Sequence, residues 1–439
     1  MNNRRELAIK TLTRVEGEGA LNATIRNGVV EQVELNIYEP PRYFEGLLRG
    51  RPLEEAPDIT ARICGICPVA YQMTACQAME DALGIRVTDE INTLRRLFYC
   101  GEWITNHSVH VFLLHLPDFL GYESSISMAA DYRELVESGL QIKKVGNQLL
   151  DIVGGRAVHP INAAIGGFHR APSQTALKSL LPSLERAIAA SVDALHFIAR
   201  LDFPEPSGTY DYVSLRHTDE YPMNTGRVVS LSGLDIAIED YEQHFRERQV
   251  AHSTALHSTM LPGDEAYLVG PLARINLCFD QLSPIAKREA QRCRVNWAAA
   301  SIYQSVIARM LELIDAFEEA ICIIRDYQVE PAITRVEYSP RDAVGMHATE
   351  APRGLLYHRY AIRSDGKIAE AKIVPPTSQN QAQIELDLRQ LLEASIDQAD
   401  DQLTGSCERL IRSYDPCISC ATHFVKLNLT RANESPQRA

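Results

Sequence analysis

The chain contains 439 residues with a mass of 49.0 kDa, and its 45% apolar content with 24 glycines and 22 prolines excludes collagen-like, low-complexity and disordered classes. Its 57 acidic and 44 basic residues give a net charge of −13, which argues against nucleic acid as a partner. No apolar run is long enough for a transmembrane helix, and the beginning MNNRRELAIK lacks the apolar segment of an export signal, so we expect a cytoplasmic protein without a membrane span.

The first forty residues have the pattern of strands. The segments ALNATIR and VVEQVELNIYE flank Asn27-Gly28, a dipeptide that favours a tight hairpin turn. We therefore expect a small β element over residues 5–39.

A helix is predicted after the Arg62-to-Cys67 segment RICGIC. Pro68 suits the first helical position and Gly84 suits the C-terminal cap, with the apolar-rich PVAYQMTACQAMEDAL between them. Cys67 should then lie at the mouth of this helix.

The middle of the chain is predicted to be a mass of helices. Helical apolar spacing occurs near residues 91–116, 130–152, 174–200, 285–326 and 380–403. Around 204–280 and 327–378 the periodicity weakens, and β-branched runs favour short strands. Because no repeat or flexible linker divides the chain, we expect one mainly α unit with peripheral β (α+β) over residues 1–439, with a β-containing segment 1–60 and a helical core 61–423.

Two C-x-x-C units are the strongest chemical signal. Cys64-Gly-Ile-Cys67 and Cys417-Ile-Ser-Cys420 lie about 350 residues apart, whereas the pairs of a zinc ribbon are separated by roughly 15–20 residues. A buried metal that joins the two ends of the chain fits this separation better, although the motifs alone leave a local structural zinc site open.

The residues around the second unit predict how its thiols are presented. Asp415 is a good N-cap and Pro416 a good first helical residue, so both sulfurs should lie in the first turns of a helix, whose dipole favours the thiolate. The i, i+3 spacing would place Cys417, Cys420 and His423 on one face. A pocket of four thiolates selects nickel, zinc, copper(I) or iron–sulfur over hard cations.

Taken together, these motifs resemble the two signatures of the large subunit of nickel–iron hydrogenases. The resemblance extends over nearly the whole chain and includes, in the family's order, Arg14-Val15-Glu16-Gly17, Phe44-Glu45, Arg62-to-Cys67, His115-Leu-Pro-Asp118, Gly154-Gly155-Arg156 with His159-Pro160, Glu350-Ala-Pro-Arg353-Gly354, Pro376-Thr377-Ser-Gln-Asn380 and Asp415-to-His423. Within the family, the PVAYQM continuation and the lack of an export signal are most similar to the cytoplasmic nicotinamide-linked multimeric hydrogenases. The resemblance implies the multihelical large-subunit fold with an N-terminal β-hairpin, and catalysis of the reversible heterolytic cleavage of H2.

The resemblance also implies the metal ligands. Cys64 and Cys417 would be terminal ligands of nickel, and Cys67 and Cys420 would bridge nickel to an iron that carries two cyanides and one carbon monoxide, the Ni-Fe(CN)2(CO) centre. Glu16 matches the family's proton-gate glutamate, a base within hydrogen-bond reach of a terminal sulfur. On position alone, Glu16 would be read as a surface or capping carboxylate.

Other site residues follow from the same resemblance. Arg353 matches the arginine suspended over the metals, and Asp118 and Asp415 match the carboxylates that surround it. Pro376 and Thr377 correspond to the wall beside the iron ligands, where a hydroxyl or a backbone donor holds cyanide.

The resemblance further implies a hard divalent ion, Mg²⁺ or a similar ion, behind the active site. Glu45, the carbonyl of Ile373 and His423 match its ligands. Without the family match, His423 would be read as a histidine that faces a helix dipole. In most of the family the chain is cut after this histidine once nickel is inserted, so residues 424–439 form a possible cleavable tail, with a permanent edge strand at FVKLNL as the alternative.

One position departs from the family. Tyr71 occupies the place of histidine in the commoner pattern C-x-x-C-x-x-x-H, and we expect its phenol to tune a bridging thiolate. The remaining cysteines are isolated in the sequence, and we expect them to pack as small apolar residues: Cys76, Cys100, Cys278, Cys293, Cys322 and Cys407.

The electron path must leave this chain, because the sequence has no G-x-G-x-x-G fingerprint and no further cysteine cluster. The resemblance implies a small subunit that carries the iron–sulfur clusters, flavin- and NAD(P)-binding diaphorase subunits, a maturation endopeptidase and a nickel chaperone. Two alternatives remain: a non-catalytic electron-transfer subunit of a complex I-like assembly, in which the nickel cysteines are lost, and a structural zinc protein. The electron acceptor, the direction of H2 turnover and the oxygen tolerance are not encoded in any motif.

Overall fold

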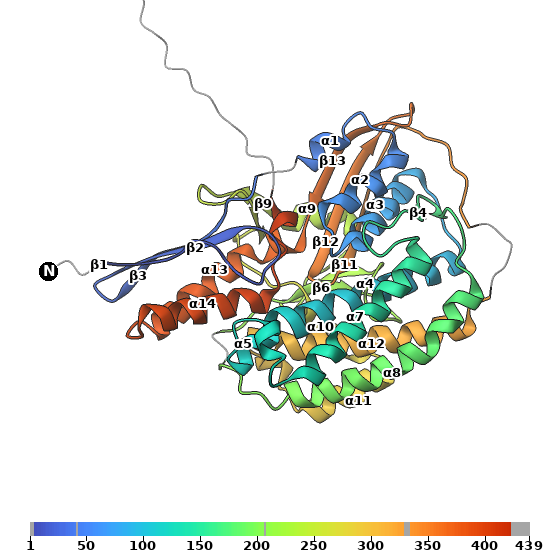
Figure 1. Cartoon of the computed structure of the whole chain (residues 1–439). Coiled ribbons are helices and arrows are strands. Elements are labelled where there is room, and N and C mark those ends of the chain that lie inside the picture. Colours follow the sequence, from blue (N-terminus) through green and yellow to red (C-terminus); the bar gives the residue numbers. More distant parts are fainter. Residues whose placement is uncertain (1–3, 41–42, 206–207, 329–333, 423–439) are drawn as a thin grey trace, which may run out of the picture.

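The N-terminal residues form the expected β element. The computed structural model describes residues 4–40, 43–205, 208–328 and 334–422. Strands β1 (Arg4–Ile9), β2 (Gly19–Arg26) and β3 (Val29–Ile37) make an antiparallel sheet in the order β1-β2-β3, which extends from the body of the molecule in Figure 1. Asn27 and Gly28 connect β2 to β3 with φ of 51° and 80°, as the hairpin signal predicts.

The body is the predicted mass of helices (Figure 1). Its long members are α4 (Asp89–Ser108), α7 (Arg133–Gly154), α8 (Gln174–Ile198) and α12 (Ser305–Asp326), and α4 and α8 each pack against both α7 and α12. Beyond α4 the chain continues as the π-helix η3 (Val109–His115) and α5 (Leu116–Leu120). Apolar side chains fill the space between these helices, so the main core lies here.

Two predicted helical stretches are each divided in the structure. Residues 285–326 form α11 (Pro284–Cys293), two 3-10 turns and then α12, because Arg294 adopts a left-handed conformation, φ 54°, that ends α11. Residues 380–403 belong to α13 (Pro376–Ala394) and α14 (Asp400–Tyr414). Apolar spacing continues across both breaks, and this is why periodicity alone joined the pieces.

A second three-stranded sheet lies beside the helices. Its strands β11 (Ala343–Ala351), β12 (Gly354–Ile362) and β13 (Ile368–Val374) are antiparallel and longer than the short strands that we expected. Helix α3 (Pro68–Leu83) packs on β11 and β12, and it begins at Pro68 and is capped by Gly84, φ 69°, as predicted.

Shorter elements complete the described part of the chain. The strands are β4 (Ala163–Ala164), β5 (Gly167–Phe168), β6 (Val213–Arg216), β7 (Arg227–Ser230), β8 (Asp235–Ile236), β9 (Phe245–Gln249) and β10 (Leu256–Met260). The helices are α1 (Phe44–Leu48), α2 (Ala56–Thr60), α6 (Ser125–Met128), α9 (Tyr241–His244), α10 (Pro271–Cys278) and α15 (Ile418–Ala421). Among the described helices, none has the length and apolar character needed to cross a bilayer. The fold is thus mainly helical with peripheral sheets, as expected.

Candidate metal centre and catalytic site

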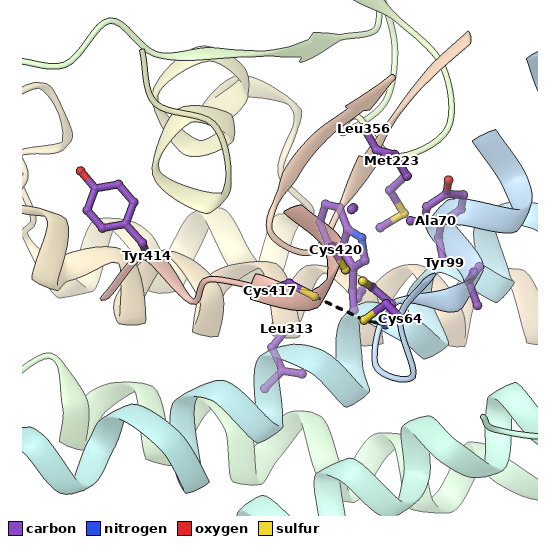
Figure 2. Packing of buried hydrophobic residues seen from close by; sticks show 14 of the residues in the cluster. Cys64, Ala70, Tyr99, Met223, Leu313, Leu356, Tyr414, Cys417 and Cys420 are labelled. Atoms are coloured by element: carbon purple, nitrogen blue, oxygen red, sulfur yellow. Dashed lines mark hydrogen bonds between the residues drawn. The ribbon is translucent and has the colours of Figure 1, made fainter. Parts of the chain in front are cut away.

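The four cysteines of the two C-x-x-C units come together in the interior. Their sulfur atoms all lie within 4.8 Å of one another, and all four side chains are buried. The Sγ atoms of Cys64 and Cys417 are 3.5 Å apart, and Figure 2 shows the sulfurs of Cys64, Cys417 and Cys420 converging from two separate segments. The structure therefore unites thiols from opposite ends of the chain.

The N-terminal pair is held by the entrance to α3. Cys64 follows the 3-10 helix η2 (Ala61–Ile63), and its Sγ accepts hydrogen bonds from the backbone N–H groups of Ile66 and Cys67, each at 3.3 Å. Cys67 is the N-cap residue, as predicted. The buried carboxylate of Glu102 accepts the N–H groups of Val69 and Ala70 at the first turn, at 2.6 and 3.1 Å. Glu102 thus satisfies helix donors directly beside the thiols.

The C-terminal pair is presented differently from the sequence prediction. Asp415 is not an N-cap: it ends α14 in a left-handed conformation, φ 54°, and Cys417 is itself the N-cap residue of α15. Only Cys420 lies within α15, which ends at Ala421, and Thr422 is extended. His423 itself lies outside the described residues, as does the tail 424–439. The carboxylate of Asp415 pairs with Arg353 instead of capping a helix.

Chemically, the pocket fits a soft metal cation. Hydrogen bonds from Cys417, Cys420 and Cys67 hold the pKa of the Cys64 thiol well below its usual range. Burial and the neighbouring sulfurs raise the pKa of Cys417, and burial raises the pKa of Cys420. One thiolate is therefore stabilised, but four thiolates in this buried space require a compensating cation. Nickel and iron in low oxidation states meet that requirement with sulfur ligands.

Glu16 lies beside one of these sulfurs. The Sγ of Cys417 donates to Oε2 of Glu16 at 3.1 Å, and the backbone N–H of Ser419 donates to the same oxygen at 3.1 Å. Residue 16 also pairs in parallel with Cys417, and its carbonyl accepts the N–H of Ile418 at 2.9 Å. This bridge between the N-terminal segment and the last motif places a carboxylate within proton-transfer reach of a thiol.

Gly17 makes this approach possible. Its φ is +90°, and a Cβ atom at this position would lie 2.7–2.8 Å from Glu39 Oε2, the Cβ of Ile418 and the backbone nitrogen of Ser419. Only glycine combines such a backbone conformation with so little space. The Glu16-Gly17 pair thus fits closely against the segment that carries Cys417.

Arg353 lies in the interior next to the thiols. Its guanidinium donates to the carbonyl of Asp415 at 2.8 Å, to the carboxylate of Asp415 at 3.1 Å and to Oδ1 of Asn106 at 3.2 Å. Although burial disfavours the charged form, Asp415 and the cysteine thiolates outweigh it and raise the pKa of Arg353 well above its usual range. A permanent cation therefore faces the four sulfurs.

Two residues that sequence reasoning missed complete this group. Asn106 donates to the carbonyl of Ile66 at 2.6 Å, so it connects Arg353 with the first C-x-x-C unit. Arg309, fully buried in α12, lies 3.7 Å from the second carboxylate oxygen of Asp415. Both are on helices with ordinary spacing, and no sequence signal separates them from core positions.

Asp118 requires a correction. Instead of surrounding Arg353, its carboxylate accepts two hydrogen bonds from Arg412 at 2.7 and 2.9 Å and pairs with Arg14. Arg412 is in the last turn of α14, and Arg14 precedes Glu16. Asp118 therefore joins the two segments that carry Glu16 and the second cysteine pair, and it acts on the site through them.

The turn that carries Arg353 is anchored by a buried ion network. Arg274 forms a two-pronged pair with Glu312, both bonds being 2.7 Å, and a third bond of 2.7 Å to Glu350. It also donates to the carbonyls of Ala351 and Pro352, each at 3.0 Å. The motif residue Glu350 thus stabilises the backbone next to Arg353.

The hydroxyl of Thr377 touches the cysteine motif itself. Pro376 and Thr377 begin α13, and Oγ1 of Thr377 accepts the backbone N–H of Cys417 at 2.9 Å. Both residues are therefore near the thiols, and Thr377 orients the backbone of Cys417.

Two of the three predicted ligands of a hard ion also lie together. The carboxylate of Glu45 accepts the backbone N–H of Ile373 at 2.8 Å. Glu45, Ile373, Cys420 and Thr422 line one pocket, so this pair shares a cavity with one of the four cysteines.

Tyr71 is buried between the thiols and a histidine. Burial, followed by the charges of Cys420, Cys67 and Cys417, raises its pKa well above the usual range, so the phenol keeps its proton. Its ring lies 5.8 Å from that of His358, between centroids.

The isolated cysteines mostly pack as expected: Cys76, Cys100, Cys278 and Cys407 are buried and Cys293 is partly buried. The expectation is wrong for Cys322, which is exposed on α12.

Comparison with known proteins identifies the class. The family model described as nickel-dependent hydrogenase matches residues 42–137 and 265–423, more than half of the chain. The chain therefore belongs to the nickel-dependent hydrogenase family, with the four clustered cysteines as its nickel–iron site.

Individual relatives match this chain over nearly its whole length. Sulfhydrogenase 1 subunit alpha of Pyrococcus furiosus is 32% identical over 424 residues, which cover 96% of this chain and 98% of the relative. Sulfhydrogenase 2 subunit alpha of the same organism is 34% identical over 96% of this chain and 100% of the relative. A crystal structure of an NAD⁺-reducing [NiFe]-hydrogenase in the H2-reduced state superposes with a TM-score of 0.88 at 27% identity and covers 95% of this chain and 99% of that one. The large-subunit fold and the catalytic activation of H2 follow from these matches, and a small subunit is the partner of such a chain.

Proposed function

We propose that this subunit cleaves H2 reversibly and exchanges the electrons with NAD(P) through partner subunits. The observation that carries the proposal is the buried set of four thiols with the carboxylate of Glu16 at 3.1 Å from the sulfur of Cys417. When bound to Cys64, Cys67, Cys417 and Cys420, a nickel–iron centre supplies the redox chemistry and the electrophile for heterolytic cleavage of H2.

Glu16 serves as the proton acceptor in this proposal. Its oxygen already receives the hydrogen bond of the Cys417 thiol, so a proton on that sulfur needs no rearrangement to reach the carboxylate. Ser419 donates its hydroxyl to Glu39 at 2.9 Å, and Glu39 is half-buried, so a second carboxylate lies next to the first on the way outward.

Arg353 and its partners form the opposite wall. The guanidinium is held by Asp415 and Asn106, so it remains fixed and charged while H2 approaches. Pro376 and Thr377 limit the wall at the start of α13, where a hydroxyl is available to the diatomic ligands of iron. Asp118 holds the Arg412 and Arg14 segments in register.

A hard divalent ion is proposed behind the thiols. Glu45 supplies a carboxylate and Ile373 a backbone carbonyl, and His423 would be the third ligand. The contact between Glu45 and Ile373 supports the first two assignments.

The electron path requires other chains. Within the described residues, the only group of clustered cysteines is the set of four, so iron–sulfur clusters belong to the small subunit, and flavin and NAD(P) to diaphorase subunits. The similarity to an NAD⁺-reducing enzyme supports a nicotinamide acceptor, and a cytoplasmic location is consistent with such an acceptor. Insertion of nickel by a chaperone and trimming by an endopeptidase complete the proposed maturation.

The proposed function is tested on the purified complex. Nickel and iron are measured by mass spectrometry, and H2-dependent reduction of NAD⁺ and NADP⁺ is followed at 340 nm. Cys417→Ser should abolish nickel binding and turnover because a serine oxygen is a poor soft-metal ligand, whereas Cys322→Ser, at an exposed thiol, should change neither. Full nickel occupancy with normal H2 turnover in Cys417→Ser would disprove the assignment.

Trimming is tested by the intact mass of nickel-loaded enzyme. A C-terminus at His423 supports removal of residues 424–439, and a full-length mass with undiminished activity shows maturation without cleavage.

The alternative function, a non-catalytic coupling subunit, is disfavoured by the four clustered thiols and by the family match.

A further inference from the structure

A second group of metal-ligating side chains lies outside the thiol site. His252, His257 and Glu385 each offer a ligand atom, and these three atoms lie within 4.8 Å of one another. His252 precedes β10, His257 is in β10, and Glu385 is in α13, some 128 residues further along the chain. No role in H2 cleavage requires these residues.

We propose that His252, His257 and Glu385 form a second metal site, which takes a divalent transition-metal ion of the zinc class. Two imidazoles and one carboxylate match the three-ligand zinc sites that leave a fourth position for water. Imidazole ligands select zinc-class ions over the hard ions Mg²⁺ and Ca²⁺.

The state of His257 points independently to a ligand. The side chain is only 2% exposed, and its Nε2 has no hydrogen-bond partner among the described residues. A buried ring nitrogen without a partner is costly, and a metal bond would remove that cost.

The surrounding groups already orient the other two ligands. Glu385 accepts the backbone N–H of Leu35 at 2.9 Å, and Glu34 lies 3.8 Å from Nδ1 of His252. A carboxylate behind a metal-bound histidine is the usual supporting arrangement. The two carboxylates Glu34 and Glu385 also offset the positive charge of the exposed Arg248, which pairs with His257 across β9 and β10.

For the pair His252 and Glu385, only a small movement separates the present geometry from that of a metal site. Nε2 of His252 and Oε1 of Glu385 are 2.8 Å apart and share a hydrogen bond. Metal bonds of about 2.0–2.1 Å in a tetrahedron separate ligand atoms by roughly 3.3 Å. The pair therefore needs to open by about half an ångström, which half-buried side chains allow.

A metal at this site would connect β10 and the residues before it with α13, next to β3, and these three segments lie beside the thiol pocket. Leu35 and Glu34 are in β3 and Glu385 is in α13, the helix that begins at Pro376. Between the two histidines, Thr254 bonds to the carbonyl of Ile37, and Ala255 pairs with Thr422, two residues after Cys420. A metal at this position would thus stabilise the segment that pairs with Thr422, next to the second cysteine motif.

The experiment uses the purified, nickel-loaded complex, so that the four thiols are occupied. After equilibration with Zn²⁺ and a competing chromophoric chelator, zinc per complex is compared among wild type, His257→Ala, Glu385→Gln and the control His196→Ala. His196 pairs with Glu289 at 2.9 Å but belongs to no group of three metal-ligating side chains among the described residues, which makes it a matched control.

We expect His257→Ala and Glu385→Gln each to lose one tightly bound zinc, with Kd raised by about a hundredfold or more, while His196→Ala keeps it. The thermal midpoint of wild type should rise with zinc, and those of the two variants should not. If a low nickel content shows that His257→Ala does not fold, His252→Gln replaces it, because the side chain of His252 is only half-buried. Equal zinc affinity in all variants, or no zinc bound by wild type and His196→Ala at micromolar Zn²⁺, would overturn the proposal.

Discussion

Glu16→Gln separates proton transfer from the other roles of this position. The amide keeps the shape of the side chain, and its oxygen can still accept the N–H of Ser419 at about the present 3.1 Å. It cannot take up a proton from the thiol of Cys417, which now donates to Oε2 at 3.1 Å. Loss of a positioned base lowers a proton-transfer rate by about 10²–10⁴-fold, equivalent to about 3–5 kcal/mol of barrier. Stability should change by only about 1 kcal/mol, since one neutral hydrogen bond replaces a charged one.

The assay is exchange between D2 and solvent protons, measured by membrane-inlet mass spectrometry, with nickel and iron contents determined on the same sample. Glu16→Gln should keep both metals and lose at least about 99% of the exchange rate. Glu18→Gln is the matched control, because Glu18 is an exposed glutamate two residues away. Exchange within a factor of about three of wild type in Glu16→Gln, with metals intact, would refute the proton-acceptor role of this carboxylate.

Three further predictions test the scaffold of the site. Gly17→Ala should destabilise the subunit by about 2–4 kcal/mol, read from its urea midpoint, because the added Cβ would meet three atoms at 2.7–2.8 Å with φ at +90°; an unchanged midpoint would contradict the close packing. Arg274→Met should lower the free energy of unfolding by about 3–5 kcal/mol, because it leaves two buried carboxylates unpaired. The control Arg216→Met, at the exposed pair with Asp280, should lower it by about 1 kcal/mol or less. Equal losses in the two variants would argue against the network. Burial lowers the pKa of His358 to about 3, so the unfolded chain takes up a proton at this histidine before the folded chain does as the pH falls below about 6.5. Between pH 6.5 and 5, the free energy of unfolding of wild type should fall by about 2 kcal/mol more than that of His358→Gln. Parallel pH profiles of the two proteins would exclude this contribution.

The sequence by itself determined the elements whose signals are local. Asn27-Gly28 dictates the hairpin because both residues accept positive φ, and Pro68 and Gly84 set the limits of α3 through helix-terminus chemistry. The two C-x-x-C units also indicated the metal pocket, because thiols in such pairs serve few chemical purposes in a chain of this kind. Spacing and residue type carry this information without any knowledge of the fold.

Only the tertiary structure decided which groups meet across long separations. Asp415 is a residue type that favours the N-cap, but it ends α14 and its carboxylate is held by the distant Arg353. Asp118 is paired with Arg412 rather than with Arg353. Likewise, His257 carries no motif, and it becomes a candidate ligand only where β10 and α13 pack together. Most of these contacts join elements that are more than a hundred residues apart in the sequence. No local propensity encodes how such distant elements pack together.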